Sequence, residues 1–516
     1  MTSTSDQDLV FAFLGDTERH PGVRRIDTHA ASVFLFGDRA LKIKRAIRLP
    51  FLDYSTLALR KAACAKELEI NRQFAPNIYL RVVAVTKAAN GSFEIGGSGS
   101  PVEYAVEMHR FDDSQTVDHL AGKGQMSAGL AERLAETIAA SHRVATEISI
   151  SGWIDSIPRW IDAFVASFRA GRRFADTEIE ELSVLCQSAF TRLRPLLERR
   201  AAEGHVRRCH GDLHLANVVV IDDEPVLFDA IEFDDRIATI DVLYDLAFPL
   251  MDLLHFSLPA AANRLLNRYL SIAAPEQTEG LAALHLFMTM RAAIRAQVFL
   301  AKLDREHSDH SDIDAQMTFD IAKSYFQLAR QLIQPVAPMM IAVGGLSGTG
   351  KSALARALAP VLAPRPGAIV LRSDVLRKQL SGVAQTDRLP TGAYTPESSA
   401  SVYQELGKLA ARALAQGFTV IVDAVFARQT ERKDIRGLAQ QLKVPFAGLF
   451  LVADLRIRQE RIQHRVNDAS DATAVVAEEQ ERYDIGALDW LQVDASGTPE
   501  ATLDRALSLL KISARA

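Results

Sequence analysis

The stretch Met339-Met340-Ile341-Ala342-Val343 is apolar, and after Gly344 the chain continues as Gly345-Leu346-Ser347-Gly348-Thr349-Gly350-Lys351-Ser352. The next residues, up to Leu358, are typical of a helix. A buried strand that turns through glycines into a helix directs backbone amides and the positive end of the helix dipole toward one point. The stretch therefore predicts a phosphate-binding loop, followed by a helix, at the end of a parallel strand.

Within this loop the residue types match the chemistry of a nucleotide triphosphate. All eight positions are expected to line the phosphates: Gly345, Leu346, Ser347, Gly348, Thr349, Gly350, Lys351 and Ser352. Lys351 would neutralise the β and γ phosphates during transfer, and the hydroxyl of Ser352 would ligate Mg²⁺. ATP and Mg²⁺ are therefore the expected cofactors of this half.

Two carboxylates follow at the ends of later strands. Asp423 ends the apolar run that starts at Thr419 and suits a magnesium contact, although it could instead cap the following turn. Asp374 follows the strand at 369–371 and would act as acid or base toward an acceptor hydroxyl, with Arg377 nearby. An N-cap role for Asp374 is the alternative.

Three arginines further along share one face of a helix. Arg458, Arg461 and Arg465 are spaced by three and four residues, and the polar segment 467–472 follows them. This face would close over the transferring phosphate as a lid, with Arg461 in a catalytic position. A solvated charged stripe is the alternative interpretation.

These residues together resemble the small P-loop kinases grouped with zeta toxins, gluconate kinases and polynucleotide 5'-kinases. The resemblance spans about 336–516 and implies phosphoryl transfer from ATP to a hydroxyl, with Asp374 on the acceptor side. It does not identify the acceptor, because the substrates of that group range from sugars to polynucleotides.

A second, unrelated signature lies earlier in the chain: His210-Gly211-Asp212-Leu213-His214-Leu215-Ala216-Asn217, then Asp229 after an apolar strand. Asp212 can orient or deprotonate an acceptor hydroxyl, while Asn217 and Asp229 can hold Mg²⁺ on a triphosphate. His210 would brace the loop. The pattern resembles aminoglycoside phosphotransferases and related small-molecule kinases of the protein-kinase-like fold, in which an aspartate at the place of Asp245 helps to anchor the loop.

The lysine-glutamate pair of that fold has candidates in an earlier sheet-forming segment. Lys42 lies on an expected strand, and Glu67 lies on the helix expected over 56–74. Strand side chains alternate, so Lys44 faces the same way as Lys42; Lys42 is preferred for its Ala-Leu-Lys setting, and Glu69 remains the alternative to Glu67.

Two further segments follow by analogy with kinases. Met108, with its neighbours, would connect the two lobes and offer backbone groups to adenine. The hairpin that would cover the nucleotide, 27–32, contains no glycine, unlike that of protein kinases. Thr28 and Ser32 would donate hydrogen bonds to phosphate or cap the turn.

The expected architecture is a multidomain chain of α/β and α+β class. A protein-kinase-like bilobal domain would occupy 1–335, with a sheet lobe at about 20–110 and a helical lobe at about 111–333, and a parallel-sheet P-loop domain would occupy 336–516. This pairing resembles a bacterial two-domain family that joins an aminoglycoside phosphotransferase-like domain to a P-loop kinase or ATPase domain.

Composition limits the partners. The net charge is −5, from 59 basic and 64 acidic residues, so nucleic acid is expected only as a kinase substrate and anionic membranes are not expected as partners. Small hydroxylated molecules fit better. The start of the chain, 1–10, lacks a signal-peptide pattern, and three scattered cysteines suit a reducing compartment, so a cytoplasmic location is expected.

The sequence therefore predicts a bifunctional ATP-dependent phosphotransferase with one site in each domain. Two alternatives stay open. The kinase-like half could bind nucleotide without catalysis and regulate the P-loop kinase, or the P-loop half could be an ATPase that needs no acceptor. The acceptors, any coupling between the sites and the oligomeric state are not predicted.

Overall fold

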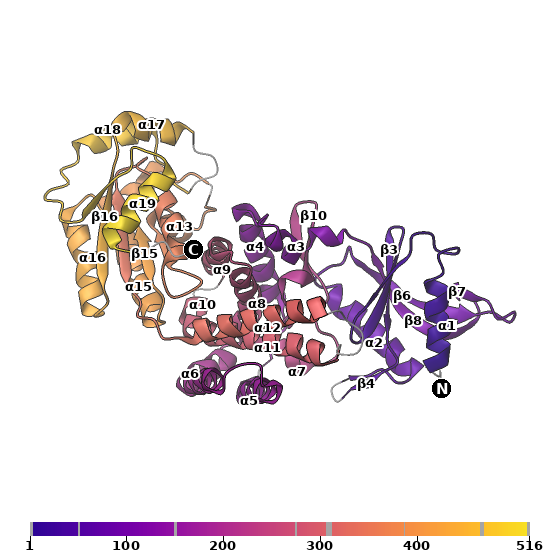
Figure 1. The fold of residues 1–516 in the computed structure, drawn as a ribbon. Coiled ribbons are helices and arrows are strands. Elements are labelled where there is room, and N and C mark those ends of the chain that lie inside the picture. Colours follow the sequence, from indigo (N-terminus) through magenta and orange to yellow (C-terminus); the bar gives the residue numbers. More distant parts are fainter. Residues whose placement is uncertain are drawn as a thin grey trace. The chain divides into compact units, whose positions relative to one another are not determined.

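The computed structural model describes residues 4–49, 52–148, 152–273, 276–305, 312–385, 387–464 and 469–512. Its contacts divide the chain into two compact units, one of residues 1–159 and 194–252, the other of residues 160–193 and 253–516. The division passes through helices and does not coincide with residue 335, where the sequence predicts a domain boundary (Figure 1). That boundary stays a prediction.

An antiparallel sheet and two helices form the first part of unit 1. The strand order is β1-β2-β3-β8-β6-β7. The elements are α1 (Thr4–Leu14), β1 (Arg24–Asp27), β2 (Ala31–Phe36), β3 (Arg39–Lys44), β4 (Arg48–Leu49), β5 (Leu52–Asp53), α2 (Leu57–Asn71), β6 (Tyr79–Lys87), β7 (Phe93–Ile95) and β8 (Ser100–His109).

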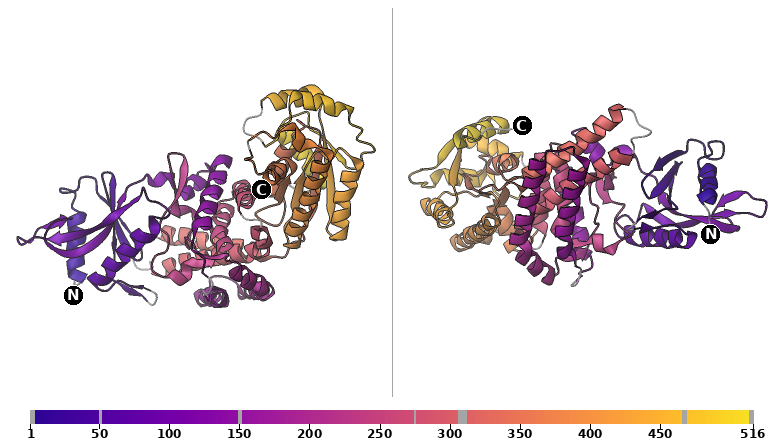
Figure 2. Two further views of the ribbon diagram at one scale, coloured as in Figure 1. Left: turned by 180° about the vertical axis from the view of Figure 1, so that it is seen from behind. Right: turned by 60° about the horizontal axis from the view of Figure 1, so that its bottom comes forward.

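The two faces of this sheet carry different helices (Figures 1 and 2). Cys64 of α2 packs in an apolar cluster with Ala40 and Val106, whereas Phe11 of α1 packs in another with Leu41 and Ala105. Successive strand residues face opposite ways, so Lys42 and Lys44 share the α2 side with Ala40. Helix α1 is not among the sequence-based expectations, and it covers the face away from the predicted site.

The rest of unit 1 continues the kinase-like pattern, with three helices that also reach into unit 2. These elements are η1 (Asp113–Gln115), α3 (Val117–Gly122), α4 (Ala128–Val144), α5 (Trp153–Gly171), α6 (Asp176–Ala202), β9 (Val206–Arg208), η2 (Leu215–Asn217), β10 (Val218–Ile221), β11 (Glu224–Leu227), α7 (Asp235–Ala238), β12 (Thr239–Asp241) and α8 (Val242–His255). Helices dominate from 128 to 202, and the short strands carry the loop with the predicted site, as expected from the sequence.

A buried ion pair ties the end of α6 to this region. Arg200 donates from Nε to Asp241 Oδ2 at 2.7 Å and from Nη2 to Asp241 Oδ1 at 2.8 Å. The backbone N–H of Leu243 also donates to Asp241 Oδ1, at 2.8 Å. Both charged side chains are fully buried, so neither has water to replace a lost partner.

We expect Asp241→Asn to lower the free energy of unfolding by about 3–5 kcal/mol, because it removes the charge of a buried carboxylate that pairs with the buried guanidinium of Arg200. Urea denaturation of the full chain followed by circular dichroism measures this. Glu198→Gln is the matched control, since Glu198 pairs with Arg194 on the exposed side of the same helix. An equal effect of the two substitutions would contradict the prediction.

Unit 2 contains a five-stranded parallel sheet in the order β14-β15-β13-β16-β17 (Figure 1). Its elements from 339 onward are β13 (Met340–Gly345), α13 (Lys351–Leu358), η4 (Ala359–Val361), β14 (Ile369–Arg372), α14 (Ser373–Leu380), η5 (Thr391–Tyr394), α15 (Pro396–Ala415), β15 (Val420–Asp423), α16 (Gln429–Gln441), β16 (Phe446–Val452), α17 (Leu455–Gln463), α18 (Ala474–Glu479), η6 (Gln480–Arg482), β17 (Leu491–Asp494) and α19 (Pro499–Leu510). The sequence predicts strands at 339–343, 369–371, 419–422 and 446–451, and each is present within two residues; β17 is an additional strand.

Unit 2 also includes helices that precede the sheet: α9 (Pro259–Ile272), α10 (Glu276–Glu279), η3 (Leu281–Ala283), α11 (Leu284–Arg305) and α12 (Asp312–Ile333). Helices α11 and α12 lie side by side (Figure 2). Helix α9 caps the edge strand β14: Asn263 and Asn267 donate to Ala368 O at 3.0 and 3.1 Å, and Asn267 Oδ1 accepts from Val370 N at 2.7 Å. These side chains satisfy backbone groups that an open edge would expose. No helix among the described residues is long and apolar enough to cross a bilayer.

Candidate functional site

A chain of ion pairs joins β3, α2 and the segment after β11 in unit 1. Lys42 Nζ lies 2.7 Å from Glu67 Oε1 and 2.5 Å from Asp229 Oδ1. Burial favours the neutral forms of these groups, yet Lys42 and Lys44 lower the pKa of Glu67 to about 2. The pKa of Lys42 is raised well above its ordinary value, since Asp229 and Glu67 outweigh the effect of burial.

The two choices left open by the sequence have different outcomes. Glu69 is exposed and pairs with Lys66, so it takes no part in this cluster. Lys44 does take part, because its Nζ lies 2.7 Å from the second oxygen of Glu67. Lys42 is the lysine that also contacts Asp229, one of the predicted metal ligands.

The segment 209–217 forms a loop held from below by buried aspartates. Asp245 Oδ1 accepts from the Gly211 N–H at 2.9 Å, and Asp252 Oδ2 accepts from the Leu215 N–H at 3.0 Å. His210 is buried, which lowers the pKa of its ring, and its Nε2 lies 2.9 Å from the carbonyl of Phe228. These contacts fit the bracing role expected of His210 and Asp245.

The predicted metal ligand Asn217 and the predicted acceptor-side residue Asp212 lie together in this loop. Asn217 Nδ2 donates to the Asp212 carbonyl at 2.9 Å and lies 3.4 Å from Asp212 Oδ2. The Asp212 side chain is 42% exposed, so an acceptor can reach it. Asp229 adopts a φ of 61°, and its backbone N–H donates to the Tyr79 hydroxyl at 3.1 Å. Carboxylate and amide oxygens of this kind suit Mg²⁺.

Gly211 has a φ of +87°, and a Cβ there would lie 2.9 Å from the Ala238 Cβ. We expect Gly211→Ala to displace Asp212 and to reduce the rate of phosphoryl transfer by unit 1 about tenfold or more. Transfer rates and melting temperatures of the full chain measure this. Gly124→Ala is the control, because Gly124 has a φ of +67° with no atom within 4 Å of its Cβ position. If the control loses as much transfer, the contact with Ala238 is not the cause.

The prediction for Met108 needs correction. Met108 lies within β8 and pairs with Ala40 of β3 and Tyr79 of β6, so its backbone groups belong to the sheet ladder. Its side chain packs in the apolar cluster on the α2 side of the sheet. Thr28 caps its own turn, with Oγ1 accepting from Ala31 N at 3.0 Å, and Ser32 donates to Asp27 at 2.6 Å.

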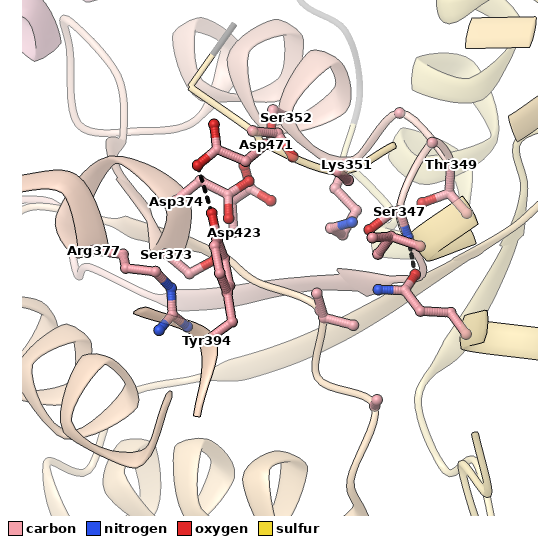
Figure 3. A pocket seen from close by; sticks show the side chains of 18 of the residues that line it. Ser347, Thr349, Lys351, Ser352, Ser373, Asp374, Arg377, Tyr394, Asp423 and Asp471 are labelled. Carbon is pink, nitrogen blue, oxygen red and sulfur yellow. Dashed lines mark hydrogen bonds between the residues drawn. The ribbon is translucent and has the colours of Figure 1, made fainter. Parts of the chain in front are cut away.

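The second site lies at the carboxyl end of the parallel sheet in unit 2 (Figure 3). Gly345, Gly348 and Gly350 have φ values of 140°, 86° and 93°. At Gly348 a Cβ would lie 2.5 Å from the Arg458 carbonyl, so the loop requires glycine there. Lys351 donates from Nζ to the Leu346 carbonyl at 3.1 Å and lies over the loop.

The metal ligands and the acceptor carboxylate predicted for this half lie close together. The Ser352 hydroxyl donates to Asp423 Oδ2, and Arg372 Nε lies 3.4 Å from the same oxygen. Asp374 lies in the first turn of α14, whose N-cap is Arg372, so the N-cap alternative for Asp374 is wrong. Burial raises the pKa of Asp374, Asp423 raises it further, and Lys351 and Arg372 act in the opposite direction.

The predicted arginine face has a different arrangement. Arg458 is buried and donates to the Ser347 carbonyl at 2.8 Å, so it braces the phosphate loop and is not a lid residue. Arg461 donates to the carbonyls of Thr349 and Gly497, at 3.4 and 2.8 Å. Arg465 lies outside the described residues.

A cavity of 1280 Å³ extends from the phosphate loop past Asp374. Arg377 lines it but is turned toward 393–399, donating to the carbonyl of Ala393 at 2.8 Å and to the hydroxyls of Ser398 and Ser399 at 3.1 and 3.2 Å. Gln480 also lines the cavity, and its Oε1 accepts from Ser347 N at 2.7 Å. Sequence reasoning missed Gln480, because a lone glutamine more than 120 residues away carries no local pattern.

Comparisons with known proteins match the two halves separately. The model of a phosphotransferase enzyme family matches residues 33–284, and that of an AAA domain matches residues 340–484. An uncharacterized protein of Mycobacterium tuberculosis is 27% identical over 493 residues, which cover 93% of this chain and 94% of that protein. An adenylyl-sulfate kinase of Myxococcus xanthus is 32% identical over 114 residues, 22% of this chain and 57% of that enzyme.

Among solved structures, a choline/ethanolamine kinase family protein from Mesorhizobium loti aligns with 64% of this chain and 99% of its own, at 14% identity and a TM-score of 0.38. The two family matches support phosphotransferase activity and cover both predicted nucleotide signatures. The chain therefore joins a domain of the phosphotransferase enzyme family, at residues 33–284, to a P-loop domain of the AAA type, at residues 340–484.

Proposed function

We propose that the chain is a bifunctional kinase that transfers the γ-phosphoryl group of ATP to hydroxyl groups of small molecules, with one site in each unit. The observation that carries the proposal is that two different folds present the same combination of functional groups. Each site combines an ammonium group, oxygen ligands for a metal and a separate carboxylate beside them: Lys42, Asn217, Asp229 and Asp212, then Lys351, Ser352, Asp423 and Asp374.

The residues present fit magnesium ATP at both sites, because Asp229 and Asn217, or Ser352 and Asp423, offer oxygen ligands next to a lysine. Bound Mg²⁺ would offset the negative charge of the phosphates. Lys42 or Lys351 would hold the phosphate oxygens in place. The acceptor oxygen would bond to the γ-phosphorus as the bond to ADP breaks, and Asp212 or Asp374 would take the hydroxyl proton.

One feature of the P-loop cavity bears on the acceptor. Arg377 is 8% exposed and, among the described residues, no carboxylate pairs with it; its partners are a carbonyl, two hydroxyls and the ring of Tyr394. A buried guanidinium without a counter-charge is costly. An acceptor with an anionic group would supply that counter-charge to Arg377. Arg377 lies three residues after Asp374 in the same helix, α14. Adenylyl sulfate, the substrate named for the Myxococcus xanthus relative, belongs in the test for this reason.

Isotope-labelled ATP and a panel of acceptors test the proposal on the full chain. The panel contains sugars, aminoglycosides, nucleosides, 5'-hydroxyl oligonucleotides and adenylyl sulfate. Lys42→Met and Lys351→Ala should each abolish the phosphorylation of a different acceptor. If all transfer survives Lys42→Met, the kinase-like half is a regulatory module and the bifunctional proposal fails. If ATP turnover needs no acceptor, the P-loop half is an ATPase.

A further inference from the structure

Two lysines share one buried glutamate in unit 1. Lys42 and Lys44 lie 2.7 Å from different oxygens of Glu67, whose side chain is 0% exposed. A kinase site of the proposed kind needs one such lysine, because only one ammonium group has to reach the phosphates. The second lysine is therefore in excess of the proposed chemistry.

The second lysine is too enclosed to bind a ligand. The Lys44 side chain is 4% exposed, against 13% for Lys42. Its Nζ also contacts Glu232 Oε1, and it lies 5.5 Å from the ring centre of Tyr54. Tyr54 in turn donates to Glu232 Oε1 at 3.3 Å.

These contacts link three segments that are far apart in the sequence. Lys44 lies on β3, Glu67 on α2, and Glu232 three residues after Asp229. The α2 helix holds the same segment a second time, since Asn71 Oδ1 accepts from Ala230 N at 2.7 Å and Asn71 Nδ2 donates to Ala230 O at 3.2 Å. The Lys44–Glu232 pair thus fixes the distance between Glu67 and the metal-ligand segment.

Removal of Lys44 would change what Glu67 does. One carboxylate oxygen would be left buried without its cation, and all of the negative charge of Glu67 would act on Lys42. Lys42 would then be held more firmly at Glu67, away from Asp229 and from a phosphate. With Lys44 present, one of the two carboxylate oxygens of Glu67 is already paired with the ammonium group of Lys44.

We propose that Lys44 and Glu232 are positioning residues of the nucleotide site in unit 1, which set the place of Glu67 and Asp229 around Lys42 without touching the nucleotide. The inference rests on the proposed function of that site. It predicts that nucleotide affinity depends on Lys44 through its contacts with both Glu67 and Glu232.

The test measures binding of magnesium ADP by isothermal titration calorimetry to the full chain carrying Lys351→Ala, so that the P-loop site is weakened. We expect Lys44→Met to raise Kd about tenfold. In a Glu67→Gln background the same substitution should have a smaller effect, because only the contact with Glu232 is then left to lose. An unchanged Kd, or an equal tenfold effect in both backgrounds, would overturn the proposal.

A second variant separates positioning from stability. Lys44→Gln combined with Glu232→Gln removes both charges of the pair and should restore part of the melting temperature that Lys44→Met loses, because the buried charge of Glu232 is gone and Glu67 regains an amide donor. We expect its affinity for magnesium ADP to stay low. If affinity returns together with the melting temperature, the pair is only structural and the proposal is wrong, even where Lys44→Met alone fails to fold.

Reference variants keep this result apart from the proposed function. Lys42→Met and Asp229→Asn should weaken magnesium ADP binding in the same assay. If neither does, the nucleotide site itself is misplaced and the proposed function of unit 1 fails. If both do and the Lys44 variants do not, only the present inference fails.

Discussion

Replacing Asp374 by asparagine is expected to lower phosphoryl transfer at the P-loop site by about 10²–10⁴-fold, the range for loss of a positioned acid or base. The asparagine keeps the shape of the side chain but cannot take the proton of an acceptor hydroxyl. Transfer from labelled ATP to an acceptor found with the panel measures the loss. Transfer by unit 1 in the same preparation should be unchanged.

The same substitution should stabilise the protein at neutral pH. Burial and the neighbouring Asp423 raise the pKa of Asp374 in the folded chain, so its ionised form is disfavoured there relative to the unfolded chain. Stability therefore falls as pH rises from the ordinary pKa through the raised one, and a neutral asparagine avoids that loss. A melting temperature below that of the parent protein at pH 7 would contradict this argument. Asp434→Asn, on the exposed side of α16, serves as the control.

Replacing Asp212 by asparagine is expected to lower phosphoryl transfer at the kinase-like site by about 10²–10⁴-fold. Asp212 is the only exposed carboxylate that the structure places beside Asn217 within the described part of the loop 209–217. Its substitution should leave magnesium ADP affinity nearly unchanged, because Lys42 and Asp229 hold the nucleotide. Single-turnover transfer and calorimetry together measure both quantities.

A matched control for Asp212 lies in the same lobe. Asp222 is exposed in the β10–β11 turn at a φ of 51°, a conformation that asparagine also adopts readily. Asp222→Asn should leave transfer and stability unchanged. If Asp212→Asn keeps full transfer, the kinase-like half does not use this aspartate and its proposed mechanism is wrong.

Most of the secondary-structure elements could be predicted from short, local sequence patterns. The strand-glycine-helix succession at 340–358 and the order of the later strands are short-range features, and the parallel sheet contains each of them within two residues. Lys42 and Lys44 face the same way because successive side chains of a strand alternate between its two faces. This alternation is a local property of one strand and can be predicted without any long-range contact. Helix α1 and strand β17 were missed, since neither has a motif or a strong neighbouring signal.

Long-range contacts were beyond the reach of such patterns. No local rule distinguishes Arg458 from Arg461, yet one is buried against the Ser347 carbonyl and the other bridges Thr349 and Gly497. Met108 has the residue context of a lobe connection, but it lies inside β8, in register with Ala40 of β3 and Tyr79 of β6. Glu232 and Gln480 became candidates only when the fold brought them to Lys44 and Ser347.

By itself, the sequence of this protein determined that there are two nucleotide signatures of different construction, because each consists of residues within one loop and its flanking strand. Only the tertiary structure decided which charges meet: Lys42 with both Glu67 and Asp229, Lys44 with Glu232, and Ser352 with Asp423. The physical reason is that a loop motif depends on consecutive backbone dihedrals, whereas an ion pair depends on distances between segments that only packing sets.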